Sequence, residues 1–262
     1  MTSRPIALVT GASGGIGESI AREFAAKGYD LVLVARTKDR LDALAADLRA
    51  SYGAQSTVIA MDLAATDAGH RLATDVLARG IAIDMLVNNA GFADYGNLWE
   101  ANGEKIDQMI RLNMATLTEL MHDLLPAMVA RGSGRVMNIA STAAFLSGPL
   151  MAVYYATKAY VLSLSEAVNE ELKGTGVTVT AVCPGPTESG FQAKAEMEAS
   201  KLFKGAKIMD VDTVARVAVS STLKGKPVAV VGLKNKLTVL SPRFLPRRLV
   251  PAVVKRAQGA AH

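Results

Sequence analysis

Seven short apolar runs, rich in β-branched and aliphatic residues, recur along the chain and alternate with longer stretches that have helical spacing. The runs are residues 6–9, 31–35, 57–61, 84–88, 135–139, 177–182 and 228–232. Runs that are apolar almost throughout are typical of strands buried on both faces of a parallel sheet. Their alternation with helices predicts an α/β fold: a doubly wound, Rossmann-like sheet of about seven parallel strands with helices on both faces.

The stretches between the runs predict five helices. They cover residues 18–27, 38–50, 67–78, 103–131 and 151–172, the fourth being a long helical region. Half of the 262 residues are apolar and 20% are charged, which is sufficient for one large core. Because no internal repeat or Pro/Gly-rich linker interrupts the pattern, we expect a single domain over residues 1–235 and a basic, proline-containing tail over residues 236–262.

The chain is basic, with a net charge of +5 and a pI of about 9.3. This balance is compatible with nucleic acid, a membrane surface or a phosphorylated cofactor. A single cysteine, Cys183, excludes an internal disulfide and fits a reducing compartment. No signal peptide is apparent, and no apolar run reaches about 18 residues. We therefore expect a cytoplasmic protein without a membrane-spanning helix.

A glycine-rich turn, TGASGGIG, follows the first expected strand and leads into the first helix. Glycines let the backbone approach a pyrophosphate, whose charge is met by free N–H groups at the helix N-terminus. The fixed points are Gly11, Gly15 and Gly17, in the spacing G-x-x-x-G-x-G rather than G-x-G-x-x-G. The strand-turn-helix setting predicts a dinucleotide site, and a tight connection without a ligand is the alternative.

Tyr154 and Lys158 are four residues apart in the last expected helix. Tyr154 follows Ser141 by thirteen residues. Residues four apart lie on the same face of a helix. A neighbouring ammonium favours phenolate, so we expect the pKa of Tyr154 to fall from about 10 toward neutrality, where it suits acid–base catalysis. Taken alone, the pair also fits an ordinary surface contact. Tyr155 has Ala159 four residues on and cannot form such a pair.

Five motifs in this order resemble the short-chain dehydrogenase/reductase family over residues 5 to roughly 235. They are TGASGGIG, NNAG ending at Gly91, Ser141, the Tyr154-x-x-x-Lys158 pair, and Pro184-Gly185. The resemblance implies that Tyr154 exchanges a proton with the substrate oxygen. It also implies that Lys158 lowers the pKa of Tyr154 and binds the nicotinamide ribose, and that Ser141 polarises the substrate oxygen.

Asn113 matches the family's asparagine that holds a water behind the lysine, and its alternative is a satisfied amide in the helix core. The catalytic residues expected from the resemblance are thus Asn113, Ser141, Tyr154 and Lys158. The cofactor-binding residues expected are Gly11, Ser13, Gly14, Gly15, Ile16, Gly17, Arg36, Thr37, Arg40, Asp62, Leu63, Asn89, Ala90, Gly91, Tyr154, Lys158, Pro184, Gly185 and Thr187. For Asn89, a structural role that ties strands together is an equal alternative.

The end of the second strand predicts the cofactor. An NAD enzyme normally carries an acid there, which accepts hydrogen bonds from the ribose. This chain has Ala35, Arg36 and Thr37 instead. An arginine can pair with a 2′-phosphate that a carboxylate would repel. We therefore expect NADP(H), with Arg36 as the main phosphate ligand and Thr37, Ser13 or Arg40 as helpers. The alternative is that Arg36 only begins a solvated helix.

The expected substrate site is apolar. It is formed by Ser141, Phe145, Met151, Tyr154 and Phe191, the last within a flap over about residues 188–210. This lining favours a hydrophobic ketone, aldehyde or secondary alcohol. We expect reversible NADPH-dependent carbonyl reduction; a reductase of acyl-thioester-linked 3-ketones and a non-enzymatic NADP(H) redox sensor are the alternatives.

No metal site is expected, because His70, His122 and His262 lack ligand spacing. The tail carries Pro242, Pro246 and Pro251 among basic and apolar residues, which opposes a continuous helix. We expect it to pack on its own subunit or on a neighbour; contact with a membrane is the less favoured interpretation. Nucleic-acid binding is not expected. The resemblance implies a homodimer or homotetramer.

Overall fold

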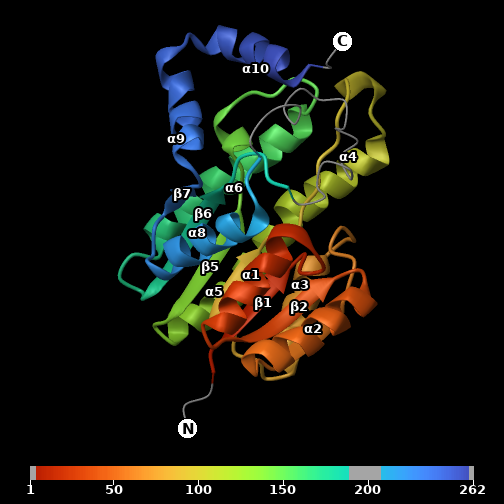
Figure 1. Ribbon diagram of the computed structural model, residues 1–262, viewed down its shortest axis with the longest axis vertical. Coiled ribbons are helices and arrows are strands. Elements are labelled where there is room, and N and C mark those ends of the chain that lie inside the picture. The colour runs from red at the N-terminus through yellow and green to blue at the C-terminus, as the bar shows by residue number, and fades with distance from the viewer. Residues whose placement is uncertain (1–3, 189–207, 260–262) are drawn as a thin grey trace.

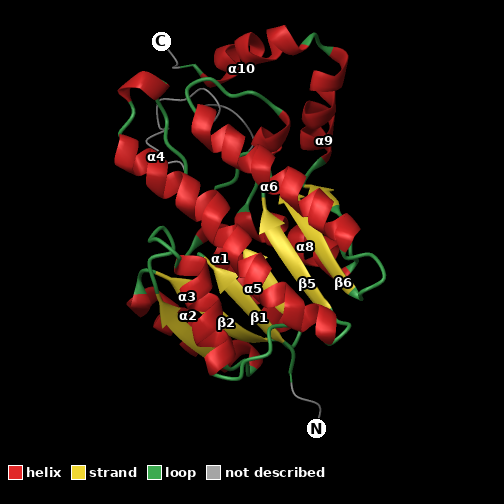
Figure 2. Cartoon of the chain, turned by 180° about the vertical axis from the view of Figure 1, so that it is seen from behind, coloured by secondary structure: helices red, strands yellow, loops and turns green. Residues whose placement is uncertain are grey.

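The computed structural model describes residues 4–188 and 208–259 and consists of one parallel sheet covered by helices on both faces (Figures 1 and 2). The strands are β1 (Ile6–Thr10), β2 (Asp30–Ala35), β3 (Ser56–Ala60), β4 (Met85–Asn88), β5 (Gly134–Ile139), β6 (Val177–Cys183) and β7 (Val228–Val230). Their order is β3-β2-β1-β4-β5-β6-β7, and every neighbouring pair is parallel. Each expected run forms a strand whose ends differ by at most two residues, so the predicted fold class is confirmed.

Alternation along the strands divides the core between the two faces. Ala7 and Val9 of β1 point into one hydrophobic cluster, whereas Leu8 points into the other. The first face is covered by α1 (Gly15–Ala26), α2 (Lys38–Tyr52) and α8 (Val211–Leu223). The second is covered by α3 (Ala68–Ala78), α5 (Thr116–Ala130) and α6 (Ala152–Glu171). Strands buried on both sides therefore need apolar residues at nearly every position.

The crossover that continues from β3 brings the chain to the opposite side of β1, where β4 pairs. The strand order thus reverses at β1. In open α/β sheets, ligands bind outside the carboxyl ends of the strands at such a reversal. The glycine turn after β1 and the NNAG segment after β4 both lie at this edge.

The expected long helix over residues 103–131 is divided in the structure. It consists of α4 (Gly103–Ile110), a π-helical turn (Arg111–Ala115) and α5. Single π turns inside helices are frequent at functional sites, and this one carries Asn113. Helix α8 was not predicted from the sequence; its N-terminus is capped by the Asp210 carboxylate, which accepts from the Thr213 N–H at 2.7 Å.

The C-terminal tail forms two short helices, α9 (Leu233–Leu240) and α10 (Val250–Gln258), joined by 3₁₀ turns (Ser241–Phe244 and Arg247–Leu249). Pro242 lies in the first of these turns, Pro246 directly precedes the second, and Pro251 lies in the first turn of α10, where a missing N–H is tolerated. Figure 1 shows α9 and α10 beyond the sheet, at the end of the molecule where the strands finish. The division expected between residues 235 and 236 falls inside α9. Within residues 4–188 and 208–259, no helix is both long and apolar enough to cross a membrane.

Candidate active site

The glycine turn brings the backbone of β1 against the first turn of α1. Gly11 and Gly15 have φ angles of +69° and +58°, which favour glycine. A side chain at Gly17 would collide with the Gly11 carbonyl oxygen and the Asn89 amide. Because α1 begins at Gly15, the N–H groups of its first turn lack intrahelical acceptors. The turn thus has the close packing and free donors of an anion site.

Two polar residues, the buried Thr10 and the half-buried Asn89, connect the ends of β1 and β4 beside this turn. The Thr10 hydroxyl donates to the Val87 carbonyl at 3.1 Å and accepts from the backbone N–H groups of Asn89 and Ala90 at 2.9 and 3.1 Å. The Asn89 amide donates to the Thr10 carbonyl at 2.9 Å. These contacts match the structural alternative for Asn89. Sequence reasoning missed Thr10, although a polar residue at the end of a buried strand was a usable signal.

The residues expected around the adenine end are exposed, with one exception. Arg36, Thr37 and Arg40 are exposed where β2 leads into α2, and Arg36 makes no ion pair with any described residue. Asp62 is exposed after β3, and its carboxylate accepts from the Ala64 N–H at 3.0 Å. The Leu63 side chain is instead buried in the core, so only its backbone can face a ligand.

Ser141, Tyr154 and Lys158 meet at the carboxyl end of β5. The side chains of Tyr154 and Ser141 are hydrogen-bonded. The Lys158 Nζ donates to the Ile139 carbonyl at 2.7 Å and lies 5.7 Å from the centre of the Tyr154 ring. Tyr154 is only 9% exposed and Lys158 only 6%. The structure thus brings together the three residues that the sequence singled out.

The expected direction of the Tyr154 pKa is wrong for this structure. Burial raises the pKa of Tyr154 far above its usual 10, and the hydrogen bond with Ser141 only partly counters it. Burial likewise lowers the pKa of Lys158 to about 8. In both cases the charged form loses hydration in the protein interior. The pKa of Tyr154 does not fall because the Lys158 ammonium is directed at the Ile139 carbonyl. Desolvation of the phenolate therefore outweighs the attraction of the ammonium for it.

Asn113 joins three parts of the site. Its amide donates to the Phe92 carbonyl at 3.0 Å and to the Thr157 hydroxyl at 3.1 Å, and its carbonyl accepts from the Phe92 N–H at 3.2 Å. A side chain at Gly91 would lie 2.9 Å from the Asn113 carbonyl oxygen. Asn113 therefore ties the loop after β4 to α6. These contacts fit the alternative of a satisfied amide, and the expected water relay stays a prediction.

The loop after β6 closes the other side of the site. The Pro184 carbonyl accepts from the Thr142 N–H at 2.9 Å, next to Ser141. The Thr187 hydroxyl donates to the Gly185 carbonyl at 2.9 Å. Gly185 has no room for a side chain because the Asn235 side chain of α9 packs against it. Asn235 was not singled out from the sequence.

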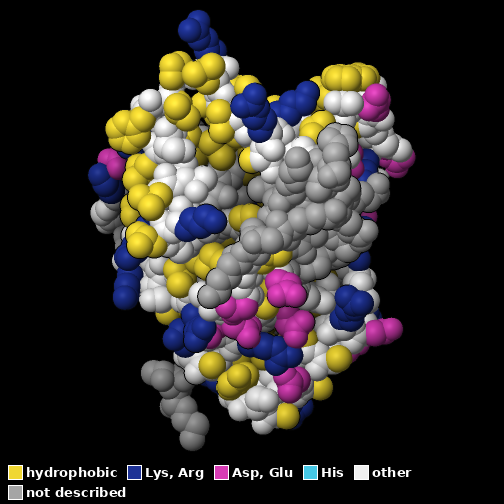
Figure 3. All heavy atoms as spheres, turned by 45° about the horizontal axis from the view of Figure 1, so that its top comes forward, with side chains coloured by type: hydrophobic (Ala, Val, Ile, Leu, Met, Phe, Trp, Pro, Cys, Tyr) yellow, Lys and Arg dark blue, Asp and Glu magenta, His cyan; other side chains and the backbone are white. Residues whose placement is uncertain are grey.

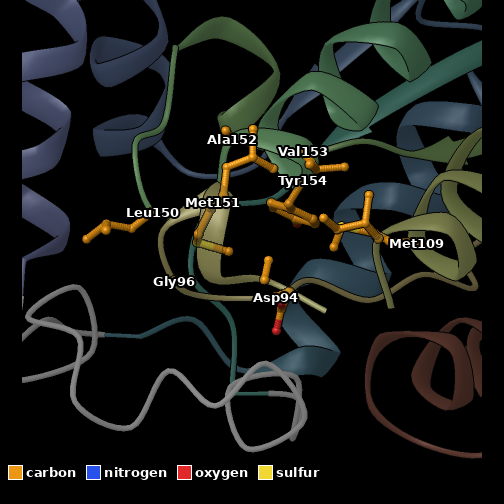
Figure 4. A pocket seen from close by; sticks show the side chains of 11 residues that line it. Asp94, Gly96, Met109, Leu150, Met151, Ala152, Val153 and Tyr154 are labelled. Carbon is orange, nitrogen blue, oxygen red and sulfur yellow. The ribbon is translucent and has the colours of Figure 1, made fainter. Parts of the chain in front are cut away.

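One pocket lies directly beside Tyr154. Figure 4 shows Met109, Met151 and Tyr154 around it, with Asp94 at its edge. The Asp94 carboxylate pairs with Lys105 at 2.6 Å, so its charge is balanced. Of the expected substrate residues, Met151 and Tyr154 line this pocket. Phe145 packs against the core cluster on the α5–α6 face instead, and Phe191 lies outside the described residues, as does most of the flap.

Two features of the pocket were not visible in the sequence. Leu150, which lines it, has a φ of +68°, a conformation that a leucine rarely adopts. Val250 and Val254 of α10 belong to the same buried cluster as Met151 and Tyr154. The C-terminal helix therefore packs on the same buried cluster as these two pocket residues. Among the described residues, no three His, Cys, Asp or Glu side chains gather as metal ligands would, and the absence of a metal from the chemistry stays a prediction.

Comparisons with known proteins agree with this arrangement. A sequence model of the short chain dehydrogenase family matches residues 5–200. The chain is 34% identical over 186 residues to the human very-long-chain 3-oxoacyl-CoA reductase, a match that covers 68% of this chain and 58% of that protein. The chain thus spans little more than half the length of this relative.

Two solved structures resemble the chain over most of its length. A short-chain dehydrogenase from Sphingobium yanoikuyae, in complex with NADPH, is 35% identical with a TM-score of 0.82, and the match covers 92% of this chain and 93% of that one. The bulky-bulky ketone specific alcohol dehydrogenase from Comamonas testosteroni is 31% identical with a TM-score of 0.78, over 94% of this chain and all of that one. With the matched sequence model, the parallel sheet and the Ser141, Tyr154 and Lys158 cluster, these findings show that the chain belongs to the short-chain dehydrogenase/reductase family.

Proposed function

We propose that this protein is an NADP(H)-dependent oxidoreductase that interconverts an apolar ketone or aldehyde and the corresponding alcohol. The observation that carries the proposal is the convergence of Ser141, Tyr154 and Lys158 at the carboxyl edge of the sheet, beside the glycine turn and an apolar pocket. A binding module would not require a buried proton donor next to a pocket.

The three side chains have separate roles in this proposal. Tyr154 donates a proton to the substrate oxygen in reduction and accepts it in oxidation; its raised pKa keeps it protonated, as a donor must be. The Ser141 hydroxyl, which is hydrogen-bonded to Tyr154, also binds the substrate oxygen. Lys158, with a pKa of about 8, supplies a positive charge at neutral pH. When bound, a nicotinamide dinucleotide supplies the hydride.

The preference for NADP(H) is supported by charge at the end of β2. Arg36 is exposed there without an ion pair among the described residues, and no acid follows β2 before Asp39. The Gly11, Gly15 and Gly17 turn fits a pyrophosphate because it offers backbone donors and excludes side chains. The Sphingobium yanoikuyae relative was solved with NADPH.

The substrate class has two candidates. Met109, Leu150 and Met151 make the described part of the pocket apolar, which favours a free hydrophobic ketone. The Comamonas testosteroni relative is named for bulky ketones. The human relative is named for 3-oxoacyl-CoA, which supports an acyl-thioester-linked 3-ketone as the second candidate. Rates on matched free and thioester-linked 3-ketones distinguish the two.

Self-association through α5 and α6 is part of the proposal. Met121, Leu125 and Val129 of α5 and Leu164 and Val168 of α6 line an apolar groove on the outer side of these helices. Apolar grooves of this kind are suited to a second copy of the chain. A cytoplasmic location stays a prediction.

The experiment is a panel of carbonyl compounds assayed with NADPH by the loss of its absorbance, with Tyr154→Phe as the variant. We expect turnover in the wild type, loss of turnover in Tyr154→Phe, and retention of NADPH binding in both. Undiminished turnover in Tyr154→Phe contradicts the proposed role of Tyr154. NADPH binding without turnover on any compound favours a redox sensor instead.

A further inference from the structure

Helix α9 turns an apolar stripe away from the protein. Leu233, Leu237 and Leu240 recur at i, i+4 and i+7, and their exposed fractions are 76%, 63% and 43%. The buried residue of the helix is Val239, on the opposite side from Leu237. A surface helix of a globular protein normally turns such a stripe to the core. In α9 the wider apolar face is the outer one.

The apolar stripe continues beyond α9. Phe244 is 85% exposed, and Leu245, Leu249 and Val253 are also exposed. We call the set of Leu233, Leu237, Leu240, Phe244, Leu245, Leu249 and Val253 the C-terminal apolar surface. It holds half of the fourteen exposed large hydrophobic side chains in the described residues, within a short segment of the chain. Single exposed apolar residues are normal, but a concentration of this kind indicates an interaction site.

The same segment is strongly and uniformly basic. Residues 233–259 contain seven cations and no acid, the cations being Lys234, Lys236, Arg243, Arg247, Arg248, Lys255 and Arg256. Each of them is exposed. Figure 3 shows yellow apolar side chains gathered over this end of the molecule with dark-blue cations among and around them. The partner of this surface must therefore accept apolar side chains and carry negative charge.

We propose that the C-terminal apolar surface binds the interface of a lipid bilayer that contains anionic headgroups. Its leucines and Phe244 enter the boundary between headgroups and acyl chains, and the cations contact lipid phosphates. A nucleic acid offers the charge but no apolar phase for seven large side chains. A second copy joined by a two-fold axis brings two sets of seven cations together without an acid between them. A bilayer meets both requirements.

The inner side of the same segment packs on the protein through buried side chains. Val239, Val250 and Val254 are buried, and α10 packs through Val250 and Val254 on the cluster that contains Met151 and Tyr154. The tail therefore packs on its own subunit, as one interpretation of the sequence has it, and still presents a separate outer face. The outer face can bind a membrane without being released from the protein.

The test uses the full chain and sedimentation with vesicles of phosphatidylcholine, with and without phosphatidylglycerol. We expect binding to the anionic vesicles that weakens at high salt. Leu237→Ser combined with Phe244→Ser is expected to reduce affinity by about tenfold or more, since both side chains leave the lipid boundary. The matched control is Leu77→Ser, which alters an exposed leucine at the far end of α3 and leaves binding unchanged.

A charge variant gives an independent readout. Arg247→Glu is expected to lower affinity for anionic vesicles by about tenfold, whereas Arg49→Glu on α2 has little effect. Equal binding to neutral and anionic vesicles, no binding, or variants that bind like the wild type would each overturn the proposal. So would a loss of oligomer mass in the Leu237→Ser, Phe244→Ser variant without loss of vesicle binding. None of these readouts depends on catalysis, so the outcome is independent of the proposed oxidoreductase activity.

Discussion

Replacing Lys158 with methionine is expected to stabilise the protein at neutral pH although it removes a side chain from the candidate active site. The Lys158 ammonium is buried, and no described carboxylate pairs with it; burial lowers its pKa from 10.5 to about 8. A charged lysine in this position therefore opposes folding at neutral pH. Methionine has nearly the same length and no charge to desolvate.

The size of the expected stabilisation follows from the pKa shift of Lys158 through proton linkage. One pKa unit corresponds to about 1.4 kcal/mol, so the shift from 10.5 to about 8 is a penalty of about 3 kcal/mol in the native state below pH 8. Methionine leaves the Ile139 carbonyl without its donor, which costs about 1 to 2 kcal/mol. The difference predicts that Lys158→Met is more stable than the wild type by about 1 to 2 kcal/mol at pH 7.

The difference in the free energy of unfolding between Lys158→Met and the wild type changes sign at high pH. Between pH 8 and 10.5 the unfolded chain binds more protons at Lys158 than the native protein, so the free energy of unfolding of the wild type rises with pH. Above this range the penalty has gone and only the hydrogen bond to Ile139 remains. The wild type is then expected to be the more stable protein, by about 1 kcal/mol.

The assay is urea unfolding of both proteins at several pH values from 7 to 10.5, with Lys226→Met at an exposed lysine as the control. The expected result is a difference between wild type and Lys158→Met that changes sign, and a difference for the control that does not. A constant difference across this range, or a wild type that is more stable at pH 7, would refute the reasoning that burial dominates the energetics of Lys158.

Three further predictions test other parts of the structure. Thr10→Val is expected to lower the free energy of unfolding by about 2 to 4 kcal/mol because three hydrogen bonds are lost; Thr180→Val is neutral or stabilising, since the buried Thr180 hydroxyl has no partner among the described residues. Leu150→Gly is expected to be more stable than Leu150→Ala by about 1 kcal/mol in the same unfolding assay, against the usual order, because φ is +68°. Arg36→Ala is expected to raise KM for NADPH about tenfold while KM for NADH changes little; equal effects on the two contradict the role of Arg36 in cofactor choice.

The sheet was predictable because its central strands are buried on both faces and therefore need apolar residues at almost every position. The ends of β1 and β2 were informative for the same reason. A glycine turn or an arginine there interrupts an otherwise apolar pattern and indicates a ligand. The segments missed were those whose conformation depends on tertiary contacts, such as the π turn that carries Asn113 and the left-handed backbone of Leu150. Neither has a local pattern that distinguishes it from an ordinary helix or loop.

The pKa of Tyr154 shows why sequence spacing alone did not predict the protonation states of the candidate catalytic residues. A separation of four positions between Tyr154 and Lys158 places the two side chains on the same helix face, and the structure has them there. Which charge state each prefers depends on how completely the surroundings exclude water. Val250 and Val254, about a hundred residues further along the chain, belong to the same buried cluster as Tyr154. The helix whose outer face we propose to meet a membrane therefore contributes, through its inner face, to the apolar cluster that contains the candidate acid.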